Sequence, residues 1–227
     1  MRVPARLAGV ILVVVAPLIA GACGDDGAVQ DDAAGTSTEA PSESTTPGEI
    51  QGLVRDDLLD VGAVTLPDVT NDQEPVPFVM KADPGRLRVV YFGYTYCPDV
   101  CPTSLAALRS AYRKLGDRAE LIDTAMVTVD PDRDLPKTLT KYLAAFFPER
   151  YHALRTTDED ELERAEDAFL ASSTVTKDKM GEVEVSHTGT TYLVDETGHV
   201  VVEWPFGAEA DDMAADMSVF LDKVETS

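Results

Sequence analysis

Residues 87–105, LRVVYFGYTYCPDVCPTSL, carry the clearest structural signal in the chain. Its first half, 87–94, is an apolar run bounded by charge on one side and a Cys-Pro step on the other, which predicts a buried strand. Apolar residues then recur at the spacing of a helix, at Leu105, Leu108, Tyr112 and Leu115. We therefore expect a helix over 102–116, with Cys97 and Cys101 at the junction between strand and helix.

The rest of the chain continues this alternation of strands and helices. In chain order we expect a lead-in hairpin over 61–80, a strand over 87–94, a helix over 102–116, a strand over 120–130, helices over 134–147 and 158–172, a closing hairpin of 190–195 and 199–206, and a helix over 209–225. A strand, a crossover helix and a second strand predict a parallel core, and the closing hairpin adds antiparallel edges. The predicted fold class is α/β, a thioredoxin-like fold with a central mixed β-sheet flanked by helices.

The two cysteines lie at the carboxyl end of the first core strand, where ligands and catalytic groups gather in open α/β sheets. Thioredoxin-type redox sites use the spacing C-x-x-C, whereas Cys97 and Cys101 follow C-x-x-x-C. On a turn that enters a helix, residues i and i+4 can converge. The pair could therefore form a disulfide or chelate a metal, and the spacing alone does not choose between them.

A missing proline bears on this choice. Thioredoxin-like reductases carry a cis-proline just before the hairpin strand that packs on the active site, but no proline lies between Pro148 and Pro205. His187 precedes that strand instead, so we expect it to face Cys97 and Cys101. Two thiolates and one imidazole form a soft set of ligands that favours Cu(I) and tolerates Cu(II). Structural zinc needs a fourth ligand, although a catalytic zinc with two Cys, one His and water remains an alternative.

The N-terminal region is typical of a bacterial lipoprotein. Residues 1–22 combine a positive start with an apolar stretch, which indicates a signal peptide. LIAGAC resembles a lipobox and predicts that Cys23 is lipidated and becomes the mature N-terminus; the alternative is an ordinary cleaved signal with an incidental cysteine. Residues 23–49 are small, polar and acidic, which predicts a disordered tether after the lipidated cysteine. One folded domain is expected over 50–227. The predicted location is extracytoplasmic, with a lipid anchor in the cell membrane.

Composition limits the partners. The chain has 41 Asp and Glu against 19 Lys and Arg, a formal net charge of −22, and such a surface repels the phosphates of nucleic acid. A hydrophobic content of 44% is sufficient to form a core. An extracytoplasmic compartment also permits disulfides, so Cys97 and Cys101 could be either reduced or joined to each other.

Three segments together resemble one known family. FGYTYCPDVCPTSL, then VTVDPDRDLP, then SHTGTTYLVDETG are similar to the Sco/SenC family of thioredoxin-like copper proteins, which are attached to membranes and help to metallate the dinuclear copper site of cytochrome c oxidase. The resemblance implies that Cys97, Cys101 and His187 bind copper. It also places Asp130 near the site, where it would support the ligands or contact a partner. Tyr96 departs from the family pattern, because many members have histidine there.

The resemblance implies a metallochaperone rather than an enzyme. It would hold one copper ion, pass it to the oxidase subunit that carries the dinuclear site, and receive it from another extracytoplasmic copper chaperone. The alternative is a thiol-disulfide oxidoreductase in which Cys97 and Cys101 keep the acceptor's cysteines reduced. A lipoprotein with a structural disulfide is a third interpretation, but so short a loop would gain little stability.

Other candidate ligands have simpler interpretations. Met213 and Met217 share the apolar face of the last helix, which favours core packing over copper binding. His152 is expected to be structural, His199 exposed in a hairpin turn, and Asp99 part of the turn between the cysteines.

Overall fold

The computed structural model describes residues 49–71 and 74–226. Contacts within the chain define a compact unit, 44–227, that contains every element described below. The predicted signal peptide, Cys23 and nearly all of the predicted tether lie outside the described residues. The unit 44–227 has its own hydrophobic core, as a domain that folds independently requires.

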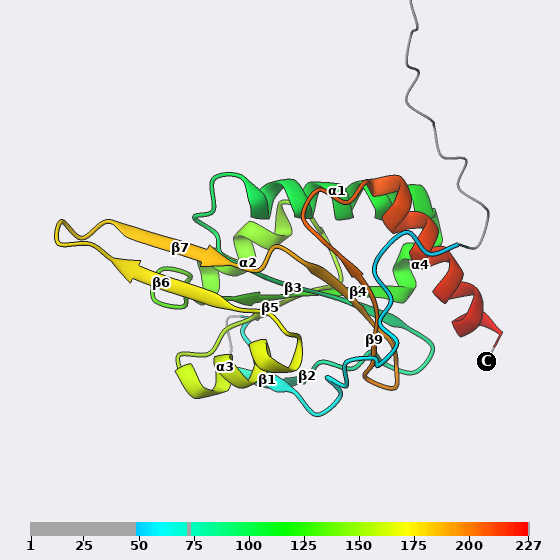
Figure 1. Ribbon diagram of the computed structural model, residues 1–227, viewed down its shortest axis with the longest axis horizontal. Coiled ribbons are helices and arrows are strands. Elements are labelled where there is room, and N and C mark those ends of the chain that lie inside the picture. The colour runs from blue at the N-terminus through cyan, green and yellow to red at the C-terminus, as the bar shows by residue number, and fades with distance from the viewer. Residues whose placement is uncertain (1–48, 72–73, 227) are drawn as a thin grey trace, which may run out of the picture. The chain divides into compact units, whose positions relative to one another are not determined.

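A mixed sheet of seven strands forms the centre of the domain (Figure 1), in the order β2-β1-β5-β4-β3-β8-β9. Its strands are β1 Thr65–Asp68, β2 Val76–Val79, β3 Leu87–Gly93, β4 Ile122–Thr128, β5 Tyr151–Leu154, β8 Thr191–Val194 and β9 Val200–Trp204. β3, β4 and β5 are parallel, β8 and β9 form an antiparallel hairpin beside β3, and β1 and β2 form another beside β5. This arrangement confirms the predicted mixed sheet and both of the predicted hairpins.

The helices cover both faces of the sheet. They are α1 Val100–Leu115, α2 Pro136–Ala144, α3 Glu159–Ala168 and α4 Ala210–Glu225, with a 3₁₀ helix, η1, at Gly116–Leu121. α1 packs against α4, while α3 contacts β1. Every residue of β3 and β4 is buried, which explains why these strands are continuous apolar runs in the sequence. Among the described residues, no helix combines the length and the apolar character needed to cross a bilayer.

Neighbouring residues of β3 show how the two faces are filled. Side chains alternate along a strand, so Tyr91 and Phe92 point to opposite faces. The ring of Phe92 meets that of Phe169, just after α3, with centroids 5.4 Å apart. Tyr91 lies on the α1 face, where a Cβ added at Gly93 would come within 2.6 Å of its ring and 3.0 Å of the Cys101 Sγ. The face that carries α1 is therefore the one that carries the cysteines.

The ends of several elements differ from the sequence-based prediction. The first helix begins at Val100 rather than at 102, so Cys101 lies in its first turn. It ends at Leu115, and Gly116 adopts a φ of +60°, which a glycine tolerates at low cost. α2 and α3 are shorter than the predicted 134–147 and 158–172.

Three strands are additional to the prediction. β5 has only four residues, and the other two, β6 Ser173–Lys177 and β7 Val183–His187, pair as a separate two-stranded sheet that projects from the domain (Figure 1). Because β6 and β7 carry mostly exposed or half-buried side chains, they lack the apolar pattern of a core strand. His187 therefore ends a strand, where a loop was expected.

The first described residues are attached to the outer strand of the sheet. Leu53 exchanges two backbone hydrogen bonds with Glu203 of β9, both 2.9 Å long. The backbone N–H groups of residues 51–52 donate to the carboxylate of Asp216 at 2.8 and 2.9 Å, and the indole N–H of Trp204 donates to the same carboxylate at 2.8 Å. Trp204 is buried, and three donors satisfy the buried Asp216.

Candidate metal centre

Two thiols and one imidazole converge at the junction of β3 and α1. The Sγ atoms of Cys97 and Cys101 and a ring nitrogen of His187 all lie within 4.8 Å of one another. The Cys101 Sγ is 3.4 Å from the His187 Nε2. In the described part of the chain, no other group of three or more His, Cys, Asp or Glu side chains is close enough to hold one ion. The fold thus brings together the three residues that the sequence analysis singled out.

The two thiols have different environments. Cys97 is half-buried, whereas Cys101 is fully buried, and neither forms a disulfide. Burial raises the pKa of the Cys101 thiol to about 12. Burial also acts to raise the pKa of Cys97, but N–H groups of Cys101 and Asp99 donate to its sulfur and hold the pKa below its ordinary value. The Cys101 N–H lies 3.3 Å from the Cys97 Sγ, so the first turn of α1 stabilises this thiolate.

The imidazole is oriented by the chain that follows it. The His187 Nδ1 lies 2.9 Å from the carbonyl oxygen of Thr188 and is assigned as the N–H that donates to it. This tautomer leaves the lone pair of Nε2 directed toward Cys101. Burial lowers the pKa of His187, so the ring is neutral at pH 7 and able to bind a metal. Tyr91 and Tyr94 meet the ring edge-to-face, with centroids 6.1 and 5.7 Å away.

Asp134 holds the loop that carries Cys97. Its carboxylate is fully buried and accepts hydrogen bonds from the Thr95 N–H at 3.0 Å, from the Thr95 hydroxyl, and from the Thr128 hydroxyl at 2.7 Å. Thr95 lies two residues before Cys97, and Thr128 ends β4. The sequence pattern predicts Asp134 only as the start of a helix. Its position in the segment VTVDPDRDLP was the available signal.

Asp130 lies outside the cluster of three ligand atoms. It is buried and forms an ion pair with Arg133, whose guanidinium group lies over the rings of Tyr94 and Tyr96, 5.8 and 5.1 Å from their centroids. The Asp130 side chain is therefore linked to the cysteine loop through Arg133, and its backbone is linked to that loop through Thr128 and Asp134. Its part in supporting the ligands or contacting a partner stays a prediction.

The remaining candidates are placed elsewhere. Met213 and Met217 are buried in the core, as expected. The His152 Nδ1 lies 2.8 Å from the Asp68 Oδ2, which fits a structural role. His199 was expected to be exposed, but this was wrong: it is half-buried, because it forms a backbone bridge with Asp60 at the start of β9.

The site and the sheet define a class of protein: a thioredoxin-like α/β domain that carries a cluster of two cysteines and one histidine at the β3–α1 junction. The model of the SCO1/SenC family matches residues 71–222, two thirds of the chain. The chain belongs to this family, which confirms the resemblance noted in its sequence.

Known proteins with a similar chain or fold include both bacterial relatives and solved structures. A SCO2-like protein of Rickettsia prowazekii is 34% identical over 116 residues, covering 50% of this chain and 56% of that relative. The chain thus spans little more than half the length of that curated relative. The apo Sco1 protein of Thermus thermophilus is 29% identical, with a TM-score of 0.60 over 78% of this chain and 96% of that one. Copper-bound ScoI of Bradyrhizobium japonicum is 30% identical, with a TM-score of 0.57 over 68% and 95%.

Proposed function

We propose that this chain is a membrane-anchored, extracytoplasmic copper chaperone. It binds one copper ion through Cys97, Cys101 and His187 and helps to metallate the dinuclear copper centre of cytochrome c oxidase. The observation that carries the proposal is the convergence of three soft donor atoms within 4.8 Å. The copper-bound structure of the Bradyrhizobium japonicum relative supports the choice of metal.

The chemistry of the three donors fits copper. Two thiolates favour Cu(I), and a neutral imidazole nitrogen lets the same set accept Cu(II). Both thiols are free, and His187 already presents the unprotonated nitrogen that a metal requires. Among the described residues no fourth Cys, His, Asp or Glu joins the cluster. The cluster therefore lacks the fourth protein ligand that structural zinc requires.

The unequal exposure of the ligands suits transfer of the ion. Cys101 is fully buried and would hold copper from the inside, whereas Cys97 is half-buried at the surface. A ligand from the acceptor can approach on the side of Cys97 and bind before the last bond to this chain breaks. The acceptor is the oxidase subunit that carries the dinuclear site, and the donor is another extracytoplasmic copper chaperone.

Anchoring belongs to the same proposal. A lipid on Cys23 and the predicted acidic tether would keep the domain at the outer membrane face where its acceptor is inserted. A lipoprotein of the same family, from Bacillus anthracis, is among the structures of similar fold. Metabolic labelling with a radioactive fatty acid tests this part. Label should enter the wild type and be absent from Cys23→Ser.

Copper binding to residues 44–227 tests the central claim. The thiols are reduced first, and Cu(I) affinity is measured without oxygen by competition with a chromophoric chelator. Cys97→Ala, Cys101→Ala and His187→Ala should each weaken binding strongly, while His152→Ala should not. One-to-one binding that does not depend on His187 would refute the proposed ligand set.

A thiol-disulfide oxidoreductase is the second candidate, and the lowered pKa of the half-exposed Cys97 favours it. In this reaction the Cys97 thiolate attacks an acceptor disulfide, and Cys101 then displaces the reduced acceptor to leave a Cys97–Cys101 disulfide. Trapping with Cys101→Ser tests it, because a mixed disulfide with the acceptor would accumulate. Rapid exchange in a protein that does not bind copper would promote this function over the first.

A further inference from the structure

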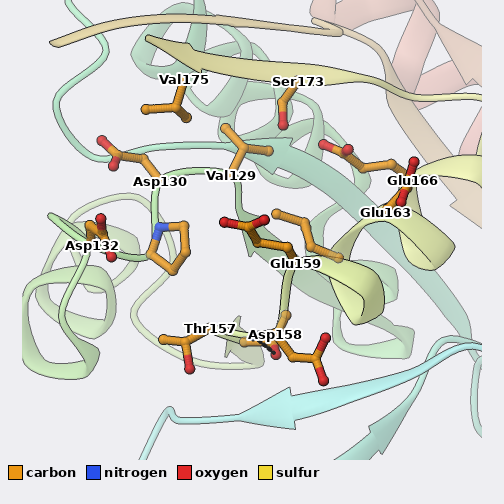
Figure 2. Close-up of a pocket in the computed structure, with 13 residues that line it drawn as sticks. Val129, Asp130, Asp132, Thr157, Asp158, Glu159, Glu163, Glu166, Ser173 and Val175 are labelled. Carbon is orange, nitrogen blue, oxygen red and sulfur yellow. Dashed lines mark hydrogen bonds between the residues drawn. The ribbon is translucent and has the colours of Figure 1, made fainter. Parts of the chain in front are cut away.

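A second recess lies beside the metal centre. It has a volume of about 390 Å³ and is formed by residues 129–132 after β4, by the start of α3, and by β6 (Figure 2). We call it the α3 cavity. None of the three proposed copper ligands lines the α3 cavity, and the proposed chaperone chemistry does not require it.

The α3 cavity is lined by acidic side chains, and one of them is unusual. Figure 2 shows the carboxylates of Glu159 and Glu166 directed into the cavity. Glu166 is only 9% exposed, and its Oε1 has no hydrogen-bond partner among the described residues. No described Lys, Arg or His forms an ion pair with either side chain. A buried carboxylate oxygen without a protein partner is costly, and the carboxylate that carries it faces the cavity (Figure 2), where a donor from outside the domain can approach it.

The arrangement of the acids selects the kind of cation. No three carboxylates of the α3 cavity lie close enough together to hold a single metal ion. Apolar side chains, Val129, Leu162 and Val175, share its walls with the acids. A planar guanidinium group fits both features, since it can donate to separated carboxylates while its stem and faces pack on apolar atoms.

The α3 cavity also adjoins the metal centre. Ser173 lines it, and Ser173 pairs with His187 across the β6–β7 ladder. On the other side, Asp130 lines the cavity and binds Arg133, which covers the rings of the cysteine loop. A group seated in the cavity would thus lie one strand away from the imidazole ligand.

We propose that the α3 cavity receives an arginine side chain of the protein that docks at the metal centre. That the arginine belongs to the copper acceptor or donor rests on the proposed function, but the preference of the cavity for a guanidinium group does not. The arginine would position the partner so that its own ligands face Cys97. The formal charge of −22 on the chain would speed the encounter with such a basic surface.

The test uses copper-free, ¹⁵N-labelled residues 44–227 and the peptide acetyl-Gly-Arg-Gly-amide. Titration should shift the amide signals of Val129, Asp130 and Asp132 and of residues 158–166 and 173–175. The matched peptide with neutral citrulline in place of arginine should cause no such shifts, and a lysine peptide should bind more weakly. Glu166→Gln should weaken the arginine peptide by at least about tenfold, because it removes a desolvated charge-assisted contact.

Glu182→Gln is the matched control, since it removes the same charge from an exposed glutamate outside the cavity. It should change the affinity by less than about twofold. Glu166→Gln should melt no lower than the wild type, because it removes an unpartnered buried charge. Equal effects of the two substitutions, equal binding of the lysine peptide, or no shifts around the cavity would each overturn the proposal.

Copper binding separates this proposal from the proposed function. Glu166→Gln should keep wild-type Cu(I) affinity, since Glu166 is not among the three ligands. Cys97→Ala should lose copper affinity and still bind the arginine peptide. Each proposal can therefore fail without the other.

Discussion

The affinity of the metal centre for Cu(I) should depend on pH in two distinct ranges. A metal binds thiolates, so each thiol that is protonated before binding releases a proton and makes the association constant rise about tenfold per pH unit. Cys101, with a pKa of about 12, releases a proton at every pH of interest. Cys97, whose pKa is below its ordinary value of 9.0, releases one only at lower pH.

These differences fix the expected slope. Below the pKa of Cys97 both thiols are protonated in the free protein, and the affinity should rise about 100-fold per pH unit. Above the pKa of Cys97 only the Cys101 proton remains to be released, so the rise should fall to about tenfold per unit and persist toward pH 10. His187 adds nothing above pH 7, because burial keeps its pKa below the ordinary 6.5.

Anaerobic competition with a Cu(I) chelator of known protonation behaviour, from pH 7 to pH 10, measures this slope. Cys97→Ser is the informative control, since it should give a slope of about one throughout. A wild-type slope near two that persists to pH 10 would refute the depressed pKa of Cys97. A slope near zero would show that neither thiol is protonated in the free protein.

Three further predictions concern the same region. Gly93→Ala would place a Cβ 2.6 Å from the Tyr91 ring and 3.0 Å from the Cys101 Sγ. We therefore expect the free energy of unfolding in urea to fall by about 1–3 kcal/mol and copper binding to weaken. Wild-type values for both would contradict this packing. Asp134→Ala leaves the Thr95 N–H and two hydroxyls without their acceptor, so unfolding should become easier by about 3–5 kcal/mol, and Asp134→Asn should lose less. Iodoacetamide at pH 8 should alkylate Cys97 well before Cys101, as mass spectrometry of peptides can follow, and equal rates would argue against the buried position of Cys101.

Much of the fold could be predicted because its central strands are buried on both faces. β3 and β4 are uninterrupted apolar runs, and the helix between them carries apolar residues at regular spacing. These patterns were enough to place Cys97 and Cys101 at the carboxyl end of a core strand. The absence of proline before β8 then indicates His187 as the residue that faces the two cysteines.

The parts that escaped prediction have a common physical cause. β5 has four residues, and β6 and β7 pair only with each other, so none of these strands shows the apolar alternation of a half-buried sheet. Asp134 and Glu166 are buried by the tertiary fold, which spacing along the chain cannot reveal. In the sequence alone, a buried acidic residue cannot be distinguished from the many exposed ones.

The attachment of residues 51–53 to β9 also protects the domain from its own copies. An outer strand with free N–H and C=O groups invites pairing with another molecule and is a common origin of aggregation. Here Leu53 occupies the edge at Glu203, and the Val200 N–H donates to the Leu59 carbonyl at 2.9 Å, so the chain covers its outer strand near both ends. The segment that leads toward the predicted anchor therefore also closes this edge of the sheet to pairing with another copy of the chain.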